Sequence, residues 1–140
     1  MYVYPGDLVF SRLSEPYGRS CILPDTYPRY VIAVDNVVLR TNEDKRFICY
    51  ISQSHPFQEI AKEAATGTTL KRISRTKLGN IQIPLPPLNE QHEIVNFLDQ
   101  RCSKIDNCIS DIRQEIELLQ QYKKSTIWEY VTGKRRVPIS

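Results

Sequence analysis

The residues with the clearest chemical character form a short basic cluster. Four cations fall within seven positions, and no Asp or Glu occurs from position 64 to position 89. A group of cations without nearby carboxylates is typical of a surface that contacts the phosphates of a nucleic acid. A solvated basic loop has the same composition, so the sequence leaves that alternative open. The cluster consists of Lys71, Arg72, Arg75 and Lys77.

The rest of the charge is unevenly distributed. The net charge is only +3, and residues 1–88 carry the whole excess, with eleven Lys and Arg against eight Asp and Glu. Residues 89–140 carry eight of each sign. Two further cations, Arg12 and Arg19, flank the first predicted strands and are secondary candidates for phosphate contact.

No constellation for catalysis, metal binding or cofactor binding is recognisable. The sequence has no Gly-rich cofactor loop, no P-loop, no Asn/Asp-Pro-Pro-aromatic methylation motif and no acidic cluster resembling a nuclease. The two histidines, His55 and His92, are isolated, and we expect surface or helix-turn positions for them. The sequence therefore predicts a protein that is not an enzyme and that needs no cofactor or metal. The cysteines form no CxxC pair and are expected to be small core residues: Cys21, Cys49, Cys102 and Cys108.

The overall composition, 41% hydrophobic and 25% charged, is ordinary for a soluble globular protein. No apolar run approaches the ~20 residues that a membrane span needs. The first five residues lack the basic-then-apolar layout of a signal peptide. Unpaired cysteines fit a reducing compartment. We therefore expect a cytoplasmic protein without a membrane partner.

Residues 1–83 have the pattern of a small α+β unit. Asn42 is a candidate N-cap for one helix, and Ser54 starts a second that runs through Ala65 and closes at Gly67. Ser74 starts one further turn. A unit of this size has a barely sufficient hydrophobic core. Short β-rich runs between turn residues predict strands at 8–10, 21–23, 30–34, 37–39 and 81–83.

A proline-rich junction, residues 84–88, separates this unit from a long helix. Its prolines fix φ and remove amide donors, which predicts a stiff, extended connector. Asn89 is the candidate N-cap of a dimerisation helix over 89–132, and Gly133 begins a C-terminal tail over 133–140. The helical stretch 89–131 would be about 64 Å long.

Apolar residues recur along this helix at alternating spacings of three and four. That is an a/d heptad, which indicates a coiled-coil seam. The chain has no second heptad segment, so we expect a partner helix from a second chain, that is, a homodimer. A helix folded along its own domain is the alternative. The seam positions are Val95, Leu98, Cys102, Ile105, Ile109, Ile112, Ile116 and Leu119.

Several of these segments together resemble the DNA specificity subunit of type I restriction–modification systems. The string Ile-Pro-Leu-Pro-Pro-Leu-Asn-Glu-Gln at 83–91, followed by Phe-Leu-Asp at 97–99, resembles the junction between a target recognition domain and a long helix. The segment Val-Thr-Gly-Lys at 131–134 resembles the end of that helix. Upstream, Gly-Asp-Leu-Val-Phe-Ser-Arg at 6–12 with Gly18, and residues 67–74 with Leu78, resemble parts of the recognition domain.

The resemblance implies a non-catalytic subunit that binds double-stranded DNA. It implies that methyltransferase (M) subunits and, in the full complex, restriction (R) subunits are positioned by it. The family carries two recognition domains and two helices that pair antiparallel, and its domains begin several dozen residues before the Gly-Asp strand. This chain has one partial domain and one helix, so we expect a truncated half-subunit.

Two hypotheses remain at this point. In the first, two copies pair through residues 89–131 and read a palindromic, interrupted DNA target. In the second, the partial domain no longer reads DNA, and the helix binds methyltransferase or intact specificity subunits as an assembly or regulatory protein. The target sequence and the orientation of helix pairing do not follow from the sequence.

Overall fold

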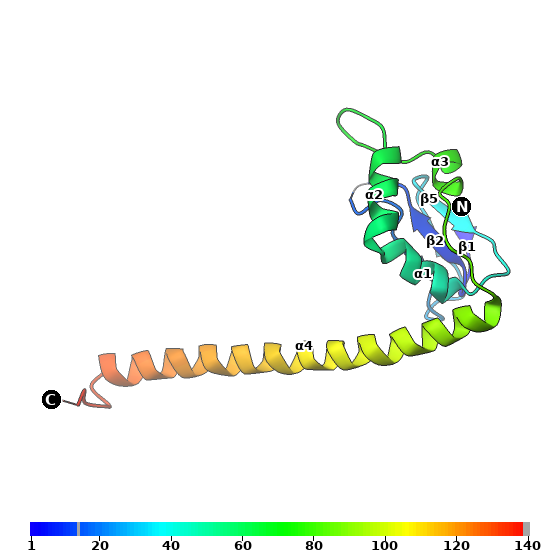
Figure 1. Ribbon diagram of the computed structural model, residues 1–140. Coiled ribbons are helices and arrows are strands. Elements are labelled where there is room, and N and C mark those ends of the chain that lie inside the picture. The colour runs from blue at the N-terminus through cyan, green and yellow to red at the C-terminus, as the bar shows by residue number, and fades with distance from the viewer. Residues whose placement is uncertain (14, 139–140) are drawn as a thin grey trace. The chain divides into compact units, whose positions relative to one another are not determined.

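The computed structural model describes residues 1–13 and 15–138, and the chain divides into two compact units, 1–96 and 97–140. The first unit contains short antiparallel strands and helices, and one long helix begins in it and continues through the second. The α+β class and the long C-terminal helix are therefore confirmed (Figure 1).

Antiparallel pairing organises the strands of the first unit. Among the described residues, β2 lies between β3 and β5 in one sheet, while β1 pairs with β4 in another. The register of the larger sheet places Val9 opposite Cys21 on one side and Val38 on the other. The strand bounds are β1 Tyr2–Val3, β2 Leu8–Ser11, β3 Ser20–Ile22, β4 Tyr30–Val31 and β5 Asn36–Leu39.

Side chains that cap helix termini fix where the short helices begin. The Asp44 carboxylate accepts hydrogen bonds from the amides of Arg46 and Phe47, at 2.7 and 3.1 Å, and the Ser74 hydroxyl accepts one from Lys77 at 3.1 Å. Each bond satisfies an amide that has no partner inside the first helical turn. The helices are α1 Lys45–Gln53, α2 His55–Ala64, α3 Arg75–Gly79 and α4 Leu88–Val131.

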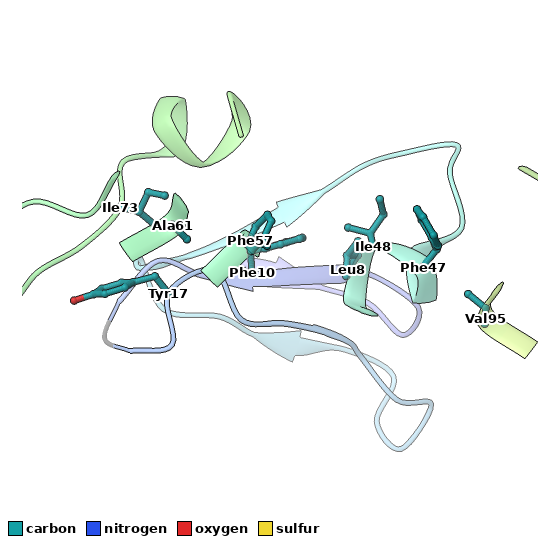
Figure 2. Packing of buried hydrophobic residues seen from close by; sticks show 9 residues of the cluster. All are labelled: Leu8, Phe10, Tyr17, Phe47, Ile48, Phe57, Ala61, Ile73 and Val95. Carbon is teal, nitrogen blue, oxygen red and sulfur yellow. The ribbon is translucent and has the colours of Figure 1, made fainter. Parts of the chain in front are cut away.

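The hydrophobic core lies between the central strand and the helices that follow it. Leu8 and Phe10 of β2 belong to one buried cluster with Phe47 and Ile48 of α1. Figure 2 shows these side chains together with residues from α2, the segment after it and the start of α4. Burying each large side chain contributes about 1.5–3 kcal/mol. The remaining members of the cluster are Tyr17, Phe57, Ala61, Ile73 and Val95.

Two predicted helix starts are wrong by one or two residues. The cap of α1 is Asp44 rather than Asn42, because a tertiary hydrogen bond from the Asp44 amide to Gln91 holds the preceding turn outside the helix. Helix α4 begins at Leu88 rather than after Asn89, and the Pro87 carbonyl accepts the amide of Gln91 at 3.1 Å. The prolines at this junction already have helix-compatible φ values, which lets the helix start early.

The strand predictions differ in three places. Residues 81–83 do not form the predicted strand. Ile81 and Ile83 are half-buried against the core while Gln82 is exposed, so the alternating pattern comes from packing against the core and not from hydrogen bonding to another strand. The expected strand over 30–34 is shortened to Tyr30–Val31, because a turn with a hydrogen bond from Asn36 to Ala33 follows. Its partner β1 was not predicted.

A buried glutamine joins the start of α4 to α1. Gln91 has no exposed surface. Its amide group donates to the Glu43 carboxylate at 2.6 Å and to the Pro86 carbonyl at 2.8 Å, and it accepts from the Asp44 amide at 3.1 Å. One turn later Val95, 3% exposed, enters the core cluster on the side of Phe47 (Figure 2). The first two turns of α4 are therefore part of the first unit.

We expect Gln91→Leu to lower the free energy of unfolding by about 1–3 kcal/mol, because it leaves the part-buried Asp44 amide and Pro86 carbonyl without their partner. Urea denaturation at one fixed protein concentration measures the change. Gln100→Leu, on the exposed face of the same helix, is the matched control and should change stability by less than about 0.5 kcal/mol. Equal stability of the two variants would contradict the role assigned to Gln91.

Candidate nucleic-acid interface

The basic cluster begins on a closed loop between α2 and α3. The backbone of Thr66 and Arg72 exchanges two hydrogen bonds of 2.9 Å, which close residues 67–71 into a small loop. Figure 1 shows this loop extending beyond the ends of the neighbouring helices. Gly67 makes the closure possible: its φ is +133°, and a Cβ there would lie 2.5 Å from the Leu70 carbonyl oxygen.

The base of the loop is attached to the core of the first unit. Ile73 is completely buried, and its amide donates to the Arg12 carbonyl at 3.0 Å. Leu13 and Arg72 form an isolated antiparallel bridge beside it. These contacts fix both ends of the loop, while residues 66–72 themselves are exposed. The loop is therefore presented to solvent from a rigid base.

A carboxylate joins two of the candidate arginines. Asp35 lies 3.2 Å from the Arg72 guanidinium and 3.8 Å from that of Arg12. Arg12 is 8% exposed, and its guanidinium also donates to the carbonyls of Val34 at 3.0 Å and Ile73 at 3.4 Å. Arg12 thus holds the loop base and Asp35 in place. Arg72 is half-exposed, with one side occupied by Asp35.

The other predicted cations are on the surface. Lys71 lies in the closed loop and Arg75 opens α3; neither side chain has a hydrogen-bond or ion-pair partner among the described residues. Lys77 is exposed and donates to the Ala64 carbonyl at 3.2 Å. Arg19 is exposed just before β3. The structure therefore brings Arg12 and Arg72 together and leaves Lys71 and Arg75 as the least engaged cations.

Sequence reasoning did not identify Asp35 as part of this arrangement. It lies 37 residues before Arg72 in a turn-forming Asp-Asn pair, and turn chemistry was the only signal it carried. Nothing in that local pattern indicates an ion pair with a distant arginine. The contact depends on tertiary structure alone.

Among the described residues, side chains with catalytic potential share no site. Burial raises the pKa of the Cys49 thiol, which keeps that thiol protonated near neutral pH and unreactive. His92 is 3.4 Å from the Asp44 carboxylate at the start of α1. In the described part of the chain, no group of three or more His, Cys, Asp and Glu residues is arranged to hold a metal ion. None of its helices has the length and apolar character to cross a membrane.

The second unit exposes most of the predicted heptad seam. Ile105, Ile109, Ile112, Ile116 and Leu119 have exposed fractions between 40% and 59%, while Leu98 and Cys102 are half-buried. Val95 differs from the rest because the first unit's own core buries it. The apolar row available to a partner therefore runs from Leu98 to Leu119.

The end of α4 is stabilised by local contacts. Gly133 adopts a φ of +73°, as expected for the residue that stops a helix. The Lys134 ammonium lies 3.8 Å from the centre of the Trp128 ring, and Arg135 pairs with Glu129 at 3.6 Å. The predicted helix stop at Gly133 is thus confirmed.

Comparison with known proteins assigns the chain to a family. Residues 2–118 match the family model described as the type I restriction modification DNA specificity domain. The chain belongs to this family. The match includes the closed basic loop and the exposed seam as far as residue 118, so the loop and most of the seam lie within one family domain. This confirms the resemblance noted in the sequence and, with it, the expectation of a specificity domain in place of a catalytic one.

Individual relatives agree with the family assignment. A putative type I restriction enzyme MjaX specificity subunit of Methanocaldococcus jannaschii is 31% identical over 136 residues, which cover 91% of this chain and 30% of that protein. The MjaVIII specificity subunit of the same organism is 36% identical over 94 residues, 67% of this chain and 21% of the relative. The EcoDI specificity subunit of Escherichia coli is 24% identical over 131 residues, 94% of this chain and 29% of the relative. The chain spans less than a third of these relatives.

We expect Gly67→Ala to disturb the closure of the specificity domain's basic loop. The new Cβ would collide with the Leu70 carbonyl in a backbone conformation that costs other residues about 1–3 kcal/mol. Hydrogen exchange at the Thr66 and Arg72 amides should accelerate, because their mutual hydrogen bonds are strained. Gly79→Ala is the control, since a Cβ there meets nothing within 4 Å. Unchanged protection of both amides in Gly67→Ala would show that the closure tolerates a side chain.

Proposed function

We propose that this chain is a non-catalytic DNA specificity component of a type I restriction–modification complex. The observation that carries this proposal is the family match over residues 2–118, which covers a solvent-presented basic loop and all but the last position of an exposed heptad seam. The loop supplies contacts to double-stranded DNA, and the helix supplies the pairing surface. The assembled pair positions methyltransferase and restriction subunits on the DNA, in the cytoplasm.

The DNA contacts come from the closed loop and the start of α3. Lys71 and Arg75 are exposed without protein partners in the described chain, so they can approach phosphates without first losing an ion pair. Arg72 is oriented by Asp35 and offers its exposed side. Lys77 and Arg19 are further exposed cations of the first unit. Arg12 acts as a positioning residue, because it is buried and its guanidinium donates to the carbonyls of Val34 and Ile73.

The exposed seam supports pairing with a second copy. Seven consecutive a and d positions from Leu98 to Leu119 would be buried in a two-helix coiled coil. In an antiparallel pair the a positions of one helix meet the d positions of the other. With the two helices in register about Asn107, Ile105 packs on Ile109 of the second copy and Cys102 packs on Ile112 of the second copy. The same register places Arg101 beside Glu115 of the second copy. This flanking pair occurs twice by symmetry and has opposite charges, which favours the antiparallel orientation.

A two-fold pair of this kind predicts the symmetry of the target. Each copy contributes one basic loop, and a two-fold axis relates the two loops. The preferred DNA site is then palindromic and interrupted, with two half-sites and an uncontacted middle.

We expect Ile109→Lys combined with Ile112→Glu to convert the dimer to a monomer. Charges forced into a buried apolar seam cost several kcal/mol. Sedimentation equilibrium measures the mass directly. The control introduces the same charges on the opposite face of the helix, as Asn107→Lys with Gln114→Glu, and should remain dimeric. A parent chain that sediments as a monomer at tens of micromolar would contradict the pairing.

We expect neutralising Lys71 and Arg75 together to weaken DNA binding of the complex assembled with methyltransferase subunits. Each lost phosphate contact reduces the slope of log K against log salt by about 0.9, so the slope should fall by up to about two units. Titrations on a random-sequence duplex over a salt series measure this slope.

The control for this experiment removes the same charge elsewhere in the first unit, as Lys62→Gln with Arg29→Gln. Lys62 is paired with Glu15, and Arg29 lies over the Tyr2 ring. This variant should keep the parent slope. If the loop variant also keeps the parent affinity and slope, the loop does not face DNA, and the assembly-protein hypothesis becomes the better description.

A further inference from the structure

We propose that an apolar groove on the first unit receives Tyr122 from the α4 helix of a second copy. The inference rests on the helix pairing proposed above and adds a contact between the end of one helix and the recognition domain of the other copy. This docking accounts both for the exposed side chain of Tyr122 and for the open apolar groove.

The groove lies where the proline junction passes the helices of the first unit. It has a volume of about 700 Å³. Its lining is mainly apolar, and two of its side chains, Ile60 and Leu85, are about half-exposed. The first turns of α4 contribute one wall of the groove through Ile94, which is half-buried. The main lining residues are Phe47, Ile51, Ile60, Leu85, Pro86 and Ile94.

The first unit determines how far the seam between two copies can extend. The seam-facing positions of the first two turns, Gln91 and Val95, are buried by the chain's own domain and cannot contact a second helix. With the helices in register about Asn107, the apolar residues from Leu98 to Ile116 pair with one another, and Leu119 comes level with Val95 of the second copy. Each seam therefore ends where the partner's recognition domain begins.

The same register brings a tyrosine to the groove. Flanking positions of the same heptad type meet in an antiparallel pair, as Arg101 and Glu115 do, and the next pair outward is Ile94 with Tyr122 of the second copy. Tyr122 is 67% exposed in the single chain. Beyond Tyr122 the a and d positions are polar, because they are occupied by Lys123 and Thr126. Polar residues suit a helix end that meets the polar edge of a domain instead of another helix.

Charge also favours this arrangement. Residues 88–121 carry seven Asp and Glu against three Lys and Arg, whereas residues 122–138 carry five Lys and Arg against one Glu. Antiparallel pairing places the basic end of one helix at the acidic start of the other. That start includes Glu90 of α4 and the carboxylates of Glu43 and Asp44, two residues that hydrogen bonds with Gln91 hold close to α4. Parallel pairing would instead bring like charges together.

Cross-linking of the full chain tests the contact. In a parent without native cysteines (Cys102→Val at the seam position, serine at the other three), Ile94→Cys and Tyr122→Cys are introduced together. The two positions are about 42 Å apart along one helix, so only a link between copies can form. We expect oxidation to yield a covalent dimer for the double variant and none for either single variant.

A groove variant gives an independent measurement. Leu85→Asp should raise the dimer dissociation constant at least tenfold, because the carboxylate would be desolvated by the docked tyrosine. Leu70→Asp, an exposed leucine in the basic loop, is the matched control and should leave dimerisation unchanged.

The outcomes separate the two proposals. A dimer that gives no link in the double variant and tolerates Leu85→Asp overturns the docking and leaves the helix pairing intact. A link in the Ile94→Cys single variant shows parallel pairing and overturns the docking. A cysteine-containing parent that sediments as a monomer overturns both.

Discussion

The buried amide of Gln91 is the interaction on which the remainder of this structure depends. A single side chain bonds to the turn before α1, to the proline junction and to Glu43, while Val95 one turn later fills the core beside them. An amide suits this position because it both donates and accepts, whereas a charged group would be costly to bury there. Through this contact the start of a 44-residue helix is made part of a small domain. Whatever the distal part of the helix binds is thereby connected to the recognition unit.

The apolar heptad row of α4 therefore has a buried part and an exposed part. The first positions of the heptad complete the core of a domain that would otherwise be barely large enough, and the later ones remain exposed. Domain folding and the proposed helix pairing therefore use the same sequence pattern but different residues of it. The boundary between them falls between Val95 and Leu98, within a single turn of helix.

The sequence predicted the features that depend on local pattern. The α+β class, the long helix, its stop at Gly133 and the start of α3 at Ser74 all follow from periodicity or turn chemistry over a few residues. The features it did not predict depend on contacts between distant segments. Asp44 caps α1 in place of Asn42, because its amide donates a hydrogen bond to Gln91. Residues 81–83 alternate between half-buried and exposed like a strand but pair with no other strand. Val95 fits the heptad pattern but is buried in the core of its own domain. Likewise, composition identified a basic cluster, but only tertiary structure shows that Asp35 engages Arg72 and that Arg12 is buried.

The closed basic loop has a consequence for how such a domain diversifies. Its shape is fixed by two backbone hydrogen bonds, one glycine and a buried isoleucine, none of which involves the side chains at positions 68–71. Those four side chains can therefore vary without altering the fold that carries them. A change confined to this short stretch therefore leaves the core, the proline junction and the long helix as they are.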